Sequence, residues 1–241
     1  MPDYEKQKRN AAVEAASYVK TGMVIGIGTG TTARYLIEEL GRRVSEENLK
    51  IKGVCTSKKS EELARAAGIE ISENPEQIID LTIDGADQVN LHGTLIKGGG
   101  GALLREKIVA YNSKEMYVIV DSRKIDDENF GSFPLPVEVV PFLHRMTLEN
   151  LRKICPSTDL RKNSDGTLFI TDNGNYIADM KFGRIRETNE LEKKIKSIPG
   201  VVDVGLFNNI ADKIFEGNDD GCNIYVVSEK GRIEKEKGQF K

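Results

Sequence analysis

The chain has 241 residues, 39% of them hydrophobic and 30% charged, and a formal net charge of −3. This composition supports a packed core, and the interspersed charges leave no basic face of the kind that charge-driven nucleic-acid binding needs. No apolar run approaches the ~20 residues that span a bilayer, and the N-terminus has no signal-peptide core, so we expect a cytoplasmic protein that binds neither nucleic acid nor membrane.

Short apolar strands alternate with helices over the first half of the chain. This alternation predicts an α/β fold with a doubly wound, mainly parallel, Rossmann-like sheet. In chain order, the expected elements are a helix at 4–20, a strand at 23–27, a helix at 32–40 closed by Gly41, a strand at 49–55, a helix at 57–67, a strand at 69–71, a short helix opened by Asn74 and Pro75, a strand at 79–83, a helix from about residue 100, and a strand at 116–121.

The pattern changes after Phe130. Residues 133–141 hold three prolines and suit an edge strand or a domain crossing better than a central strand. A strand–helix–strand–strand–helix–strand order follows, which predicts a smaller, ferredoxin-like α+β domain at 130–205. Residues 1–129 and 206–241 then form the main domain, and we expect the highly charged end, 228–241, to fray. The elements expected in the second half are a helix at 142–154, turns at 164–166 and 172–174, a helix at 187–198 and a strand at 201–207.

The cysteines and histidines indicate neither a disulfide framework nor a metal site. Cys55, Cys155 and Cys222 are far apart in the sequence, and His92 and His144 are isolated. Because structural zinc sites need closely spaced Cys or His pairs, we expect chemistry without a metal.

The segment Gly26–Thr32 (GIGTGTT) joins an expected strand to an expected helix. Free backbone N–H groups at a helix N-terminus attract anions, and the hydroxyls of Thr29, Thr31 and Thr32 add donors there. The segment therefore predicts a phosphate site, with Gly30 allowing close backbone approach. The alternative is a tight turn whose threonines only cap the helix.

A dinucleotide is one possible source of that phosphate. Gly28, Gly30 and Ala33 match the loose fingerprint of dinucleotide-binding loops. NAD binding is disfavoured because no acidic residue ends the second strand, whereas Lys58 and Lys59 suit the extra phosphate of NADP.

Two further glycine-rich segments carry ionisable groups. Asp84 and Asp87 (DGAD) follow a buried strand at its carboxyl end, where open α/β sheets bind ligands. They suit cation binding, proton relay or helix capping. Lys97 precedes four glycines, whose entropic cost predicts a close backbone approach such as an oxyanion-binding turn. Glu106 lies roughly 8–10 Å further along the helix axis, and a surface ion pair is the alternative role for it.

These segments together resemble the type A ribose-5-phosphate isomerases over nearly the whole chain. The resemblance implies an aldose–ketose isomerase that interconverts D-ribose 5-phosphate and D-ribulose 5-phosphate through an enediolate, in the non-oxidative branch of the pentose phosphate pathway. It implies no cofactor, and a homodimer or homotetramer. The segments that carry it, in the family's order, are GIGTGTT, IDGAD, IKGGGGALLREKI, VDSRK, FPLPVEV, TDNGNYI and IPGVVDVGLF.

The same resemblance implies roles for single residues. Glu106 is the general base, Lys97 stabilises the developing oxyanion with the N–H groups of Gly98–Gly100, and Asp84 and Asp87 assist ring opening and shuttle hydroxyl protons. The implied substrate-binding residues are Lys8, Thr29, Gly30, Thr31, Thr32, Asp84, Gly85, Ala86, Asp87, Lys97, Gly98, Gly99, Gly100 and Lys124. Two other functions stay open, a non-catalytic sugar-phosphate sensor and an NADP-dependent oxidoreductase.

Overall fold

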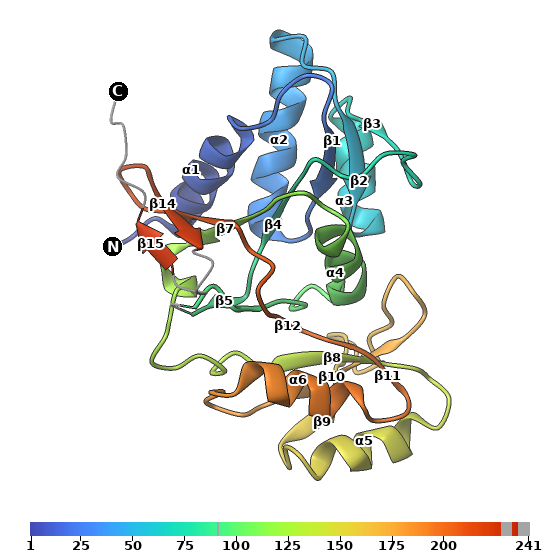
Figure 1. Cartoon of the computed structure of the whole chain (residues 1–241). Coiled ribbons are helices and arrows are strands. Elements are labelled where there is room, and N and C mark those ends of the chain that lie inside the picture. Colours follow the sequence, from blue (N-terminus) through green and yellow to red (C-terminus); the bar gives the residue numbers. More distant parts are fainter. Residues whose placement is uncertain (91, 228–232, 236–241) are drawn as a thin grey trace.

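A computed structural model describes residues 1–90, 92–227 and 233–235, and Figure 1 shows a larger α/β domain above a smaller sheet with two helices. The central sheet of the larger domain has eight strands. In spatial order they are β15 (Ile233–Lys235), β14 (Cys222–Val227), β13 (Lys213–Gly217), β7 (Met116–Asp121), β4 (Leu81–Gly85), β1 (Val24–Ile27), β2 (Lys52–Cys55) and β3 (Glu70–Ile71). The strands from β13 to β3 are parallel, and β14 and β15 add an antiparallel edge.

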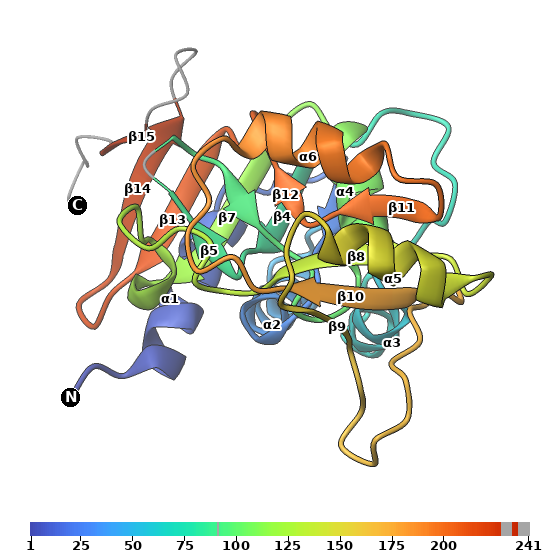
Figure 2. The same cartoon turned by 90° about the horizontal axis from the view of Figure 1, so that it is seen from below.

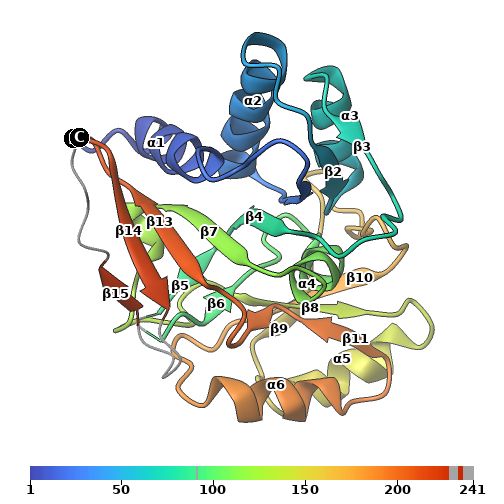
Figure 3. The ribbon, with the colours of Figure 1, turned by 45° about the horizontal axis from the view of Figure 1, so that its top comes forward.

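Helices and a small sheet cover the two faces of this central sheet. The helices α1 (Tyr4–Ala16), α2 (Thr31–Glu46) and α3 (Lys58–Ala66) lie together on one side (Figure 3). The opposite face packs against α4 (Leu103–Tyr111) and a three-stranded sheet of β12 (Leu206–Phe207), β6 (Leu95–Ile96) and β5 (Gln88–Val89). Because both faces are covered, β7 is buried along its whole length, as its unbroken apolar sequence predicts.

The order in which the strands are added to the sheet changes direction between the neighbouring strands β1 and β4. The first three parallel strands of the chain run outward from β1, and the later strands β4, β7 and β13 run outward in the opposite direction. This is the strand order of a Rossmann-like sheet, which confirms the predicted class, and its ligand crevice lies outside the carboxyl ends of the strands at that change of direction.

The smaller domain has a four-stranded antiparallel sheet with two helices. Figure 2 shows both helices on the face of this sheet that is turned away from the main domain. The β-α-β-β-α-β order confirms the ferredoxin-like prediction, while the borders at 129/130 and 205/206 stay predictions. In chain order the elements are β8 (Leu135–Val139), α5 (His144–Arg152), β9 (Thr158–Leu160), β10 (Tyr176–Met180), α6 (Thr188–Lys196) and β11 (Val201–Val204).

Residues 133–141 were expected to form an edge strand or a domain crossing rather than a central strand, and the exclusion of a central strand was wrong. Strand β8 is interior, because β10 pairs with it on one side and β11 on the other. Pro136 is tolerated there because it lies beyond the last residue of β11, where its carbonyl accepts a hydrogen bond from Gly205 N (2.7 Å) and no N–H is needed on that side.

Two helix predictions were also wrong. Residues 74–78 form no helix, because Ile79 already bridges to Ser113 and too few residues remain to nucleate one. Gly41 does not end a helix but lies inside α2. A Cβ at Gly41 would lie 2.7 Å from the Cβ of Ala67, so this glycine allows α2 and the end of α3 to pack closely.

The expected strand at 201–207 is divided at Gly205 between β11 and β12, which belong to different sheets. Within 1–90, 92–227 and 233–235, no helix is long and apolar enough to cross a membrane. Apart from Ile233–Lys235, the tail expected to fray from residue 228 onward lies outside the described residues.

Candidate active site

A cavity of about 130 Å³ lies where β1, β4 and β7 end, closed on one side by the glycine-rich loop before α4. Every predicted site residue except Asp84 lines it, and Asp84 lies behind Lys97. Two lining residues, Asp121 and Arg123, were not predicted. The lining residues are Lys8, Thr29, Gly30, Thr31, Thr32, Gly85, Ala86, Asp87, Lys97, Gly98, Gly99, Gly100, Glu106, Asp121, Arg123 and Lys124.

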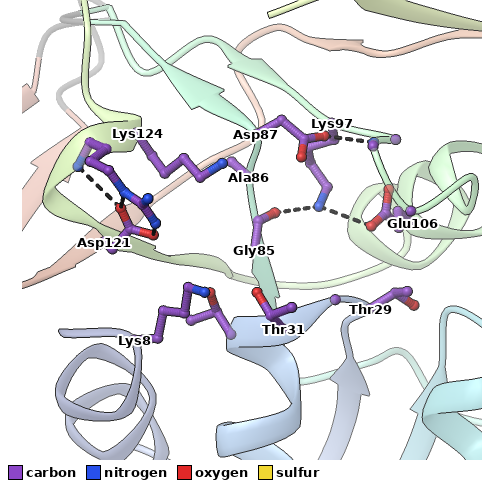
Figure 4. Close-up of a pocket in the computed structure, with 16 residues that line it drawn as sticks. Lys8, Thr29, Thr31, Gly85, Ala86, Asp87, Lys97, Glu106, Asp121 and Lys124 are labelled. Atoms are coloured by element: carbon purple, nitrogen blue, oxygen red, sulfur yellow. Dashed lines mark hydrogen bonds and ion pairs between the residues drawn. The ribbon is translucent and has the colours of Figure 1, made fainter. Parts of the chain in front are cut away.

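Lys97 is the centre of a buried charge cluster at one end of the cavity. Its side chain is 2% exposed, and its Nζ lies 3.0 Å from Asp84 Oδ2 and 3.3 Å from Glu106 Oε1. The ammonium also donates to Gly85 O (Figure 4). The backbone of Lys97 is fixed as well, because its N–H donates to the carbonyl of Gly205 at 2.9 Å. The lysine is therefore held at both its main chain and its charged end.

Glu106 reaches this cluster because it lies on the buried side of α4. Leu103, Glu106 and Val109 follow one another at helical spacing, and all three are buried. A glutamate within an otherwise apolar stripe is the sequence signal that distinguishes it from a surface ion pair. Its Oε2 is buried and has no hydrogen-bond partner among the described residues. That oxygen is free to accept a proton from a ligand.

Burial and the neighbouring charges shift the pKa values of Glu106 and Lys97. The pKa of Glu106 is raised to about 8, mainly by burial and also by the nearby Asp84 and Asp87, against the opposing effect of Lys97. Burial alone would lower the pKa of Lys97, but the charges of Asp84 and Glu106 raise it to about 12. Lys97 therefore stays charged at neutral pH, whereas Glu106 exchanges its proton close to it.

Asp84 anchors the ends of two strands as well as the lysine. Its Oδ1 accepts from Thr29 N (3.0 Å) and from Gly85 N (2.7 Å). A Cβ at Gly28 would lie 2.1 Å from that same oxygen, so only glycine lets the end of β1 approach so closely. Gly28, which matches the dinucleotide-binding fingerprint, thus makes room for the carboxylate of Asp84.

Asp87 joins the DGAD loop to the four glycines. Its Oδ2 accepts a hydrogen bond from Gly99 N at 2.7 Å. Burial raises the pKa of Asp87, against the lowering effects of the Gly99 N–H and of Lys97. Because it also lines the cavity, Asp87 is placed to exchange hydroxyl protons with a ligand.

The opposite end of the cavity is positively charged. Lys8 of α1 and Lys124 of the short 3₁₀ helix η1 (Ser122–Lys124) lie there, away from Glu106 (Figure 4). Thr31 begins α2, and the preceding Gly30 (φ +116°) offers no side chain to cap the helix. The first N–H groups of α2 therefore face an anion site with two lysines beside it.

The sequence predicts that the Thr29 hydroxyl donates to a phosphate, but in the structure this hydroxyl lies among other side-chain hydroxyls. Its Oγ1 lies 2.7 Å from Thr56 Oγ1, 2.8 Å from Ser57 Oγ and 3.1 Å from Ser60 Oγ. Ser57 also caps α3 by accepting from Ser60 N. This hydroxyl cluster ties the first glycine loop to the start of α3, while Thr31 lies at the cavity.

Asp121 and Arg123 are the residues that sequence reasoning missed. Arg123 Nε and Nη2 bind the two oxygens of the buried Asp121 at 2.8 and 3.1 Å. Its guanidinium also lies 3.6 Å from the centre of the Tyr4 ring. The sequence could have indicated Asp121, because it ends β7. Strand β7 lies next to β4, so their carboxyl ends meet at the edge of the sheet where Asp84 and Asp87 lie.

The residues that the structure describes contain no group of three or more His, Cys, Asp or Glu side chains arranged to hold a metal ion. The carboxylates of the cavity instead surround an ammonium group. Their arrangement suits proton transfer to and from a bound anionic molecule.

Comparison with known proteins agrees with this geometry. The family model of ribose 5-phosphate isomerase A (phosphoriboisomerase A) matches residues 52–221. The chain is 67% identical to the ribose-5-phosphate isomerase A of Thermoplasma acidophilum, over 100% of this chain and 99% of that one. It is 52% identical to the same enzyme of Picrophilus torridus, over 93% of this chain and 99% of that one.

Solved structures give the same result. The ribose 5-phosphate isomerase A of Methanocaldococcus jannaschii superposes with a TM-score of 0.87 at 40% identity, covering 92% of this chain and 99% of that one. A D-ribose-5-phosphate isomerase in complex with phospho-erythronic acid superposes with a TM-score of 0.88 at 37% identity, covering 93% and 99%.

Proposed function

The chain belongs to the ribose 5-phosphate isomerase A family, and we propose that Glu106 is the general base of the reaction it catalyses. The protein is an aldose–ketose isomerase that interconverts ribose 5-phosphate and ribulose 5-phosphate, a step of the pentose phosphate pathway. This activity replaces the sensor and oxidoreductase alternatives. The observation that supports Glu106 as the base is its buried, unpartnered Oε2 beside Lys97.

The isomerisation moves one hydrogen between two carbons of the open-chain sugar. Glu106 takes the proton from C2, the electron pair forms an enediolate, and the same carboxyl returns the proton to C1. Because a general base works best with a pKa near the operating pH, the pKa of about 8 suits Glu106 to both steps. The electrons stay within the substrate, so the step needs no redox partner.

Lys97 and the glycine loop carry the negative charge that develops on oxygen. The ammonium remains protonated and is fixed in position, so it stabilises an enediolate oxygen without reorganising. Backbone N–H groups of Gly98–Gly100, which line the same part of the cavity, add to this field. Burial makes each of these interactions stronger than it would be in water.

The two aspartates have separate roles in this mechanism. Asp84 is fully buried and holds Lys97 and the end of β1 in place. Asp87 lines the cavity and carries protons during ring opening and between O1 and O2. Its raised pKa lets it alternate between the two protonation states.

The substrate phosphate binds at the other end of the cavity. The N-terminus of α2, the hydroxyls of Thr31 and Thr32, and the side chains of Lys8 and Lys124 surround it. A phosphate held there places the sugar carbons toward Glu106, since the two groups lie at opposite ends of the cavity (Figure 4).

The substitution Glu106→Gln tests this assignment. It keeps the size of the side chain and removes the base, so kcat should fall by roughly 10²- to 10⁴-fold. The dissociation constant for ribose 5-phosphate, measured by calorimetry, should stay within a few-fold of the wild-type value. Glu190→Gln, on the exposed side of α6, is the control for the chemical change. Wild-type rates in Glu106→Gln would refute the role of Glu106.

We also propose that the enzyme is a cytoplasmic homodimer or homotetramer. The smaller domain carries exposed apolar side chains of the kind that subunit contacts bury, at Phe142 (78% exposed), Leu143 (56%) and Met146 (63%). Light scattering measures the mass of the assembly directly, and a particle of one 26.7 kDa chain would contradict the proposal.

A further inference from the structure

Arg161 connects the smaller domain to the glycine loop of the active site. It follows β9, and its Nη1 donates to the carbonyl oxygens of Gly98 and Gly99, both at 2.9 Å. The other side of the guanidinium is held by Asp179 of β10, with Nε 2.9 Å from Oδ2. The side chain is only 15% exposed. Arg161 does not line the cavity, so any effect on the substrate passes through the glycines or through Asp87, whose pKa is raised by burial and lowered in part by the Arg161 charge.

These contacts fix the direction of two peptide groups. In a trans peptide the C=O and the following N–H point in opposite directions. Holding the carbonyls of Gly98 and Gly99 on the side of Arg161 therefore directs the N–H groups of Gly99 and Gly100 to the other side. The Gly99 N–H is found there, donating to Asp87 Oδ2 at 2.7 Å. Among the described residues, the Gly100 N–H has no acceptor, and Gly100 lines the cavity.

Within the loop, the Gly101 N–H donates to the Gly98 carbonyl at 2.9 Å, and Arg161 adds to this support because the sequence of the loop does not specify these directions. Four consecutive glycines adopt many backbone conformations at similar cost, and peptide groups within them can reverse. Gly98 (φ +101°) and Gly101 (φ +78°) have positive φ. The hairpin that follows Arg161 holds the end of the loop as well, because a Cβ at Gly101 would lie 2.3 Å from Phe169 Cε1.

We propose that Arg161 is a positioning residue of the isomerase, which holds the Gly99 N–H on Asp87 and the Gly100 N–H toward the enediolate oxygen. The inference rests on the proposed oxyanion role of the glycine loop. It gives the smaller domain a part in the chemistry, since both Arg161 and Asp179 belong to that domain. The charge of Arg161 acts on the carbonyls and not on the substrate.

Arg105 provides a matched control. It also joins the two domains, with Nε 2.9 Å from Asn173 Oδ1 and Nη2 3.2 Å from the carbonyl of Asp172. It contacts neither the glycine carbonyls nor the cavity. The substitution Arg105→Met thus removes an interdomain contact of the same kind and leaves the loop in place.

The experiment compares Arg161→Met, Arg161→Lys and Arg105→Met with the wild type. Arg161→Met should lower kcat by roughly tenfold to a hundredfold, as expected for weakened oxyanion donors. Its affinity for phospho-erythronic acid, whose carboxylate would lie at the enediolate end, should fall similarly, while its affinity for inorganic phosphate should stay within twofold. Arg161→Lys should recover part of kcat, because an ammonium can reach one carbonyl but cannot reproduce the planar fork. Arg105→Met should keep kcat within about twofold, as expected for a contact outside the oxyanion site.

Other results would overturn the inference. A kcat in Arg161→Met close to that of the wild type would do so. Arg161→Met could instead lose affinity for phosphate and for phospho-erythronic acid equally, and Arg105→Met could show the same losses. Arg161 would then be only an interdomain contact. If Arg161→Met does not fold, the same ratio of the two affinities is read from Arg161→Lys. Wild-type protein without isomerase activity would refute the proposed function itself, and the role of Arg161 would fall with it.

Discussion

The two ends of the cavity hold charge in different ways. At one end Lys97, Asp84 and Glu106 are buried within a few ångströms of one another, and each is at most 5% exposed. At the other end Arg123 is exposed and Lys124 is half-buried, both on η1, and only Lys8 of α1 is buried. Charge removed from water interacts strongly and shifts pKa values, whereas exposed charge is screened. We therefore expect substitutions at the buried end to change kcat and stability, and those at the open end to change KM.

After Glu106→Gln, the largest expected effect is that of Lys97→Met. Loss of the ammonium should lower kcat by roughly 10²- to 10³-fold. It also leaves Asp84 buried without a counter-charge, which costs about 3–5 kcal/mol of unfolding free energy. Steady-state kinetics and urea denaturation measure the two effects.

A double variant separates chemistry from folding in this prediction. Adding Asp84→Asn to Lys97→Met removes both members of the buried pair, so much of the lost stability should return while kcat stays low. Recovery of kcat in the double variant would show that Lys97 acts only by neutralising Asp84.

The pH dependence of the reaction is the next largest effect. Only ionised Glu106 acts as a base toward C2, so kcat/KM should rise roughly tenfold per pH unit below the pKa of about 8 and level off above it. The measurement should run from about pH 6.5 to 9, because the substrate phosphate itself titrates near pH 6. A flat profile over that range would contradict a buried carboxylate base.

Stability should change with pH in the opposite direction. The pKa of Glu106 is raised from 4.5 in the unfolded chain to about 8, so the folded state binds the extra proton between these values. Its contribution is fully present below about pH 4.5 and is lost as the pH rises through 8. Compared with wild type, Glu106→Gln should therefore gain in Tm between pH 5 and pH 8.5, and an equal difference at both pH values would contradict the assigned pKa.

The smallest expected effect belongs to the open end. Lys124→Met removes one of several charges around the phosphate, so KM should rise roughly fivefold while kcat stays within about twofold. The increase should shrink at high salt, because salt already screens the wild-type attraction. Lys153→Met, an exposed lysine at the end of α5, is the control. A large loss of kcat in Lys124→Met would show that the two ends of the cavity are not separable.

The sequence allowed much of the site to be predicted because its residues lie in short segments at strand ends. Asp84, Asp87 and the GIGTGTT loop follow neighbouring parallel strands, and the sheet brings such segments together. What the sequence could not reveal is burial. Glu106 is buried because α4 packs against β4, β8 and β11, and its raised pKa depends on that burial.

Arg161, Pro136 and Gly41 were missed or misread because their places depend on contacts between distant segments. Arg161 lies 62 and 63 positions from the glycines it binds, and no local pattern marks the pairing. Pro136 was taken as evidence against a central strand because proline is rare there. It is tolerated in the interior strand β8 because it lies beyond the paired part of β11. Gly41 was interpreted as a helix end, whereas tertiary packing against Ala67 explains it.

Gly205, where the chain leaves β11 and enters β12, has a mechanical consequence. Its carbonyl accepts the N–H of Lys97 at 2.9 Å, so this lysine lies next to the point where the chain passes from one sheet to another. Points near a pivot hardly move when the bodies on either side rotate. A swing of the smaller domain about Gly205 would leave Lys97 nearly stationary and carry Arg161 and Phe169 away from the four glycines. Rotation of the smaller domain would then release the glycine N–H groups from their fixed directions, while the Lys97 ammonium stays in place.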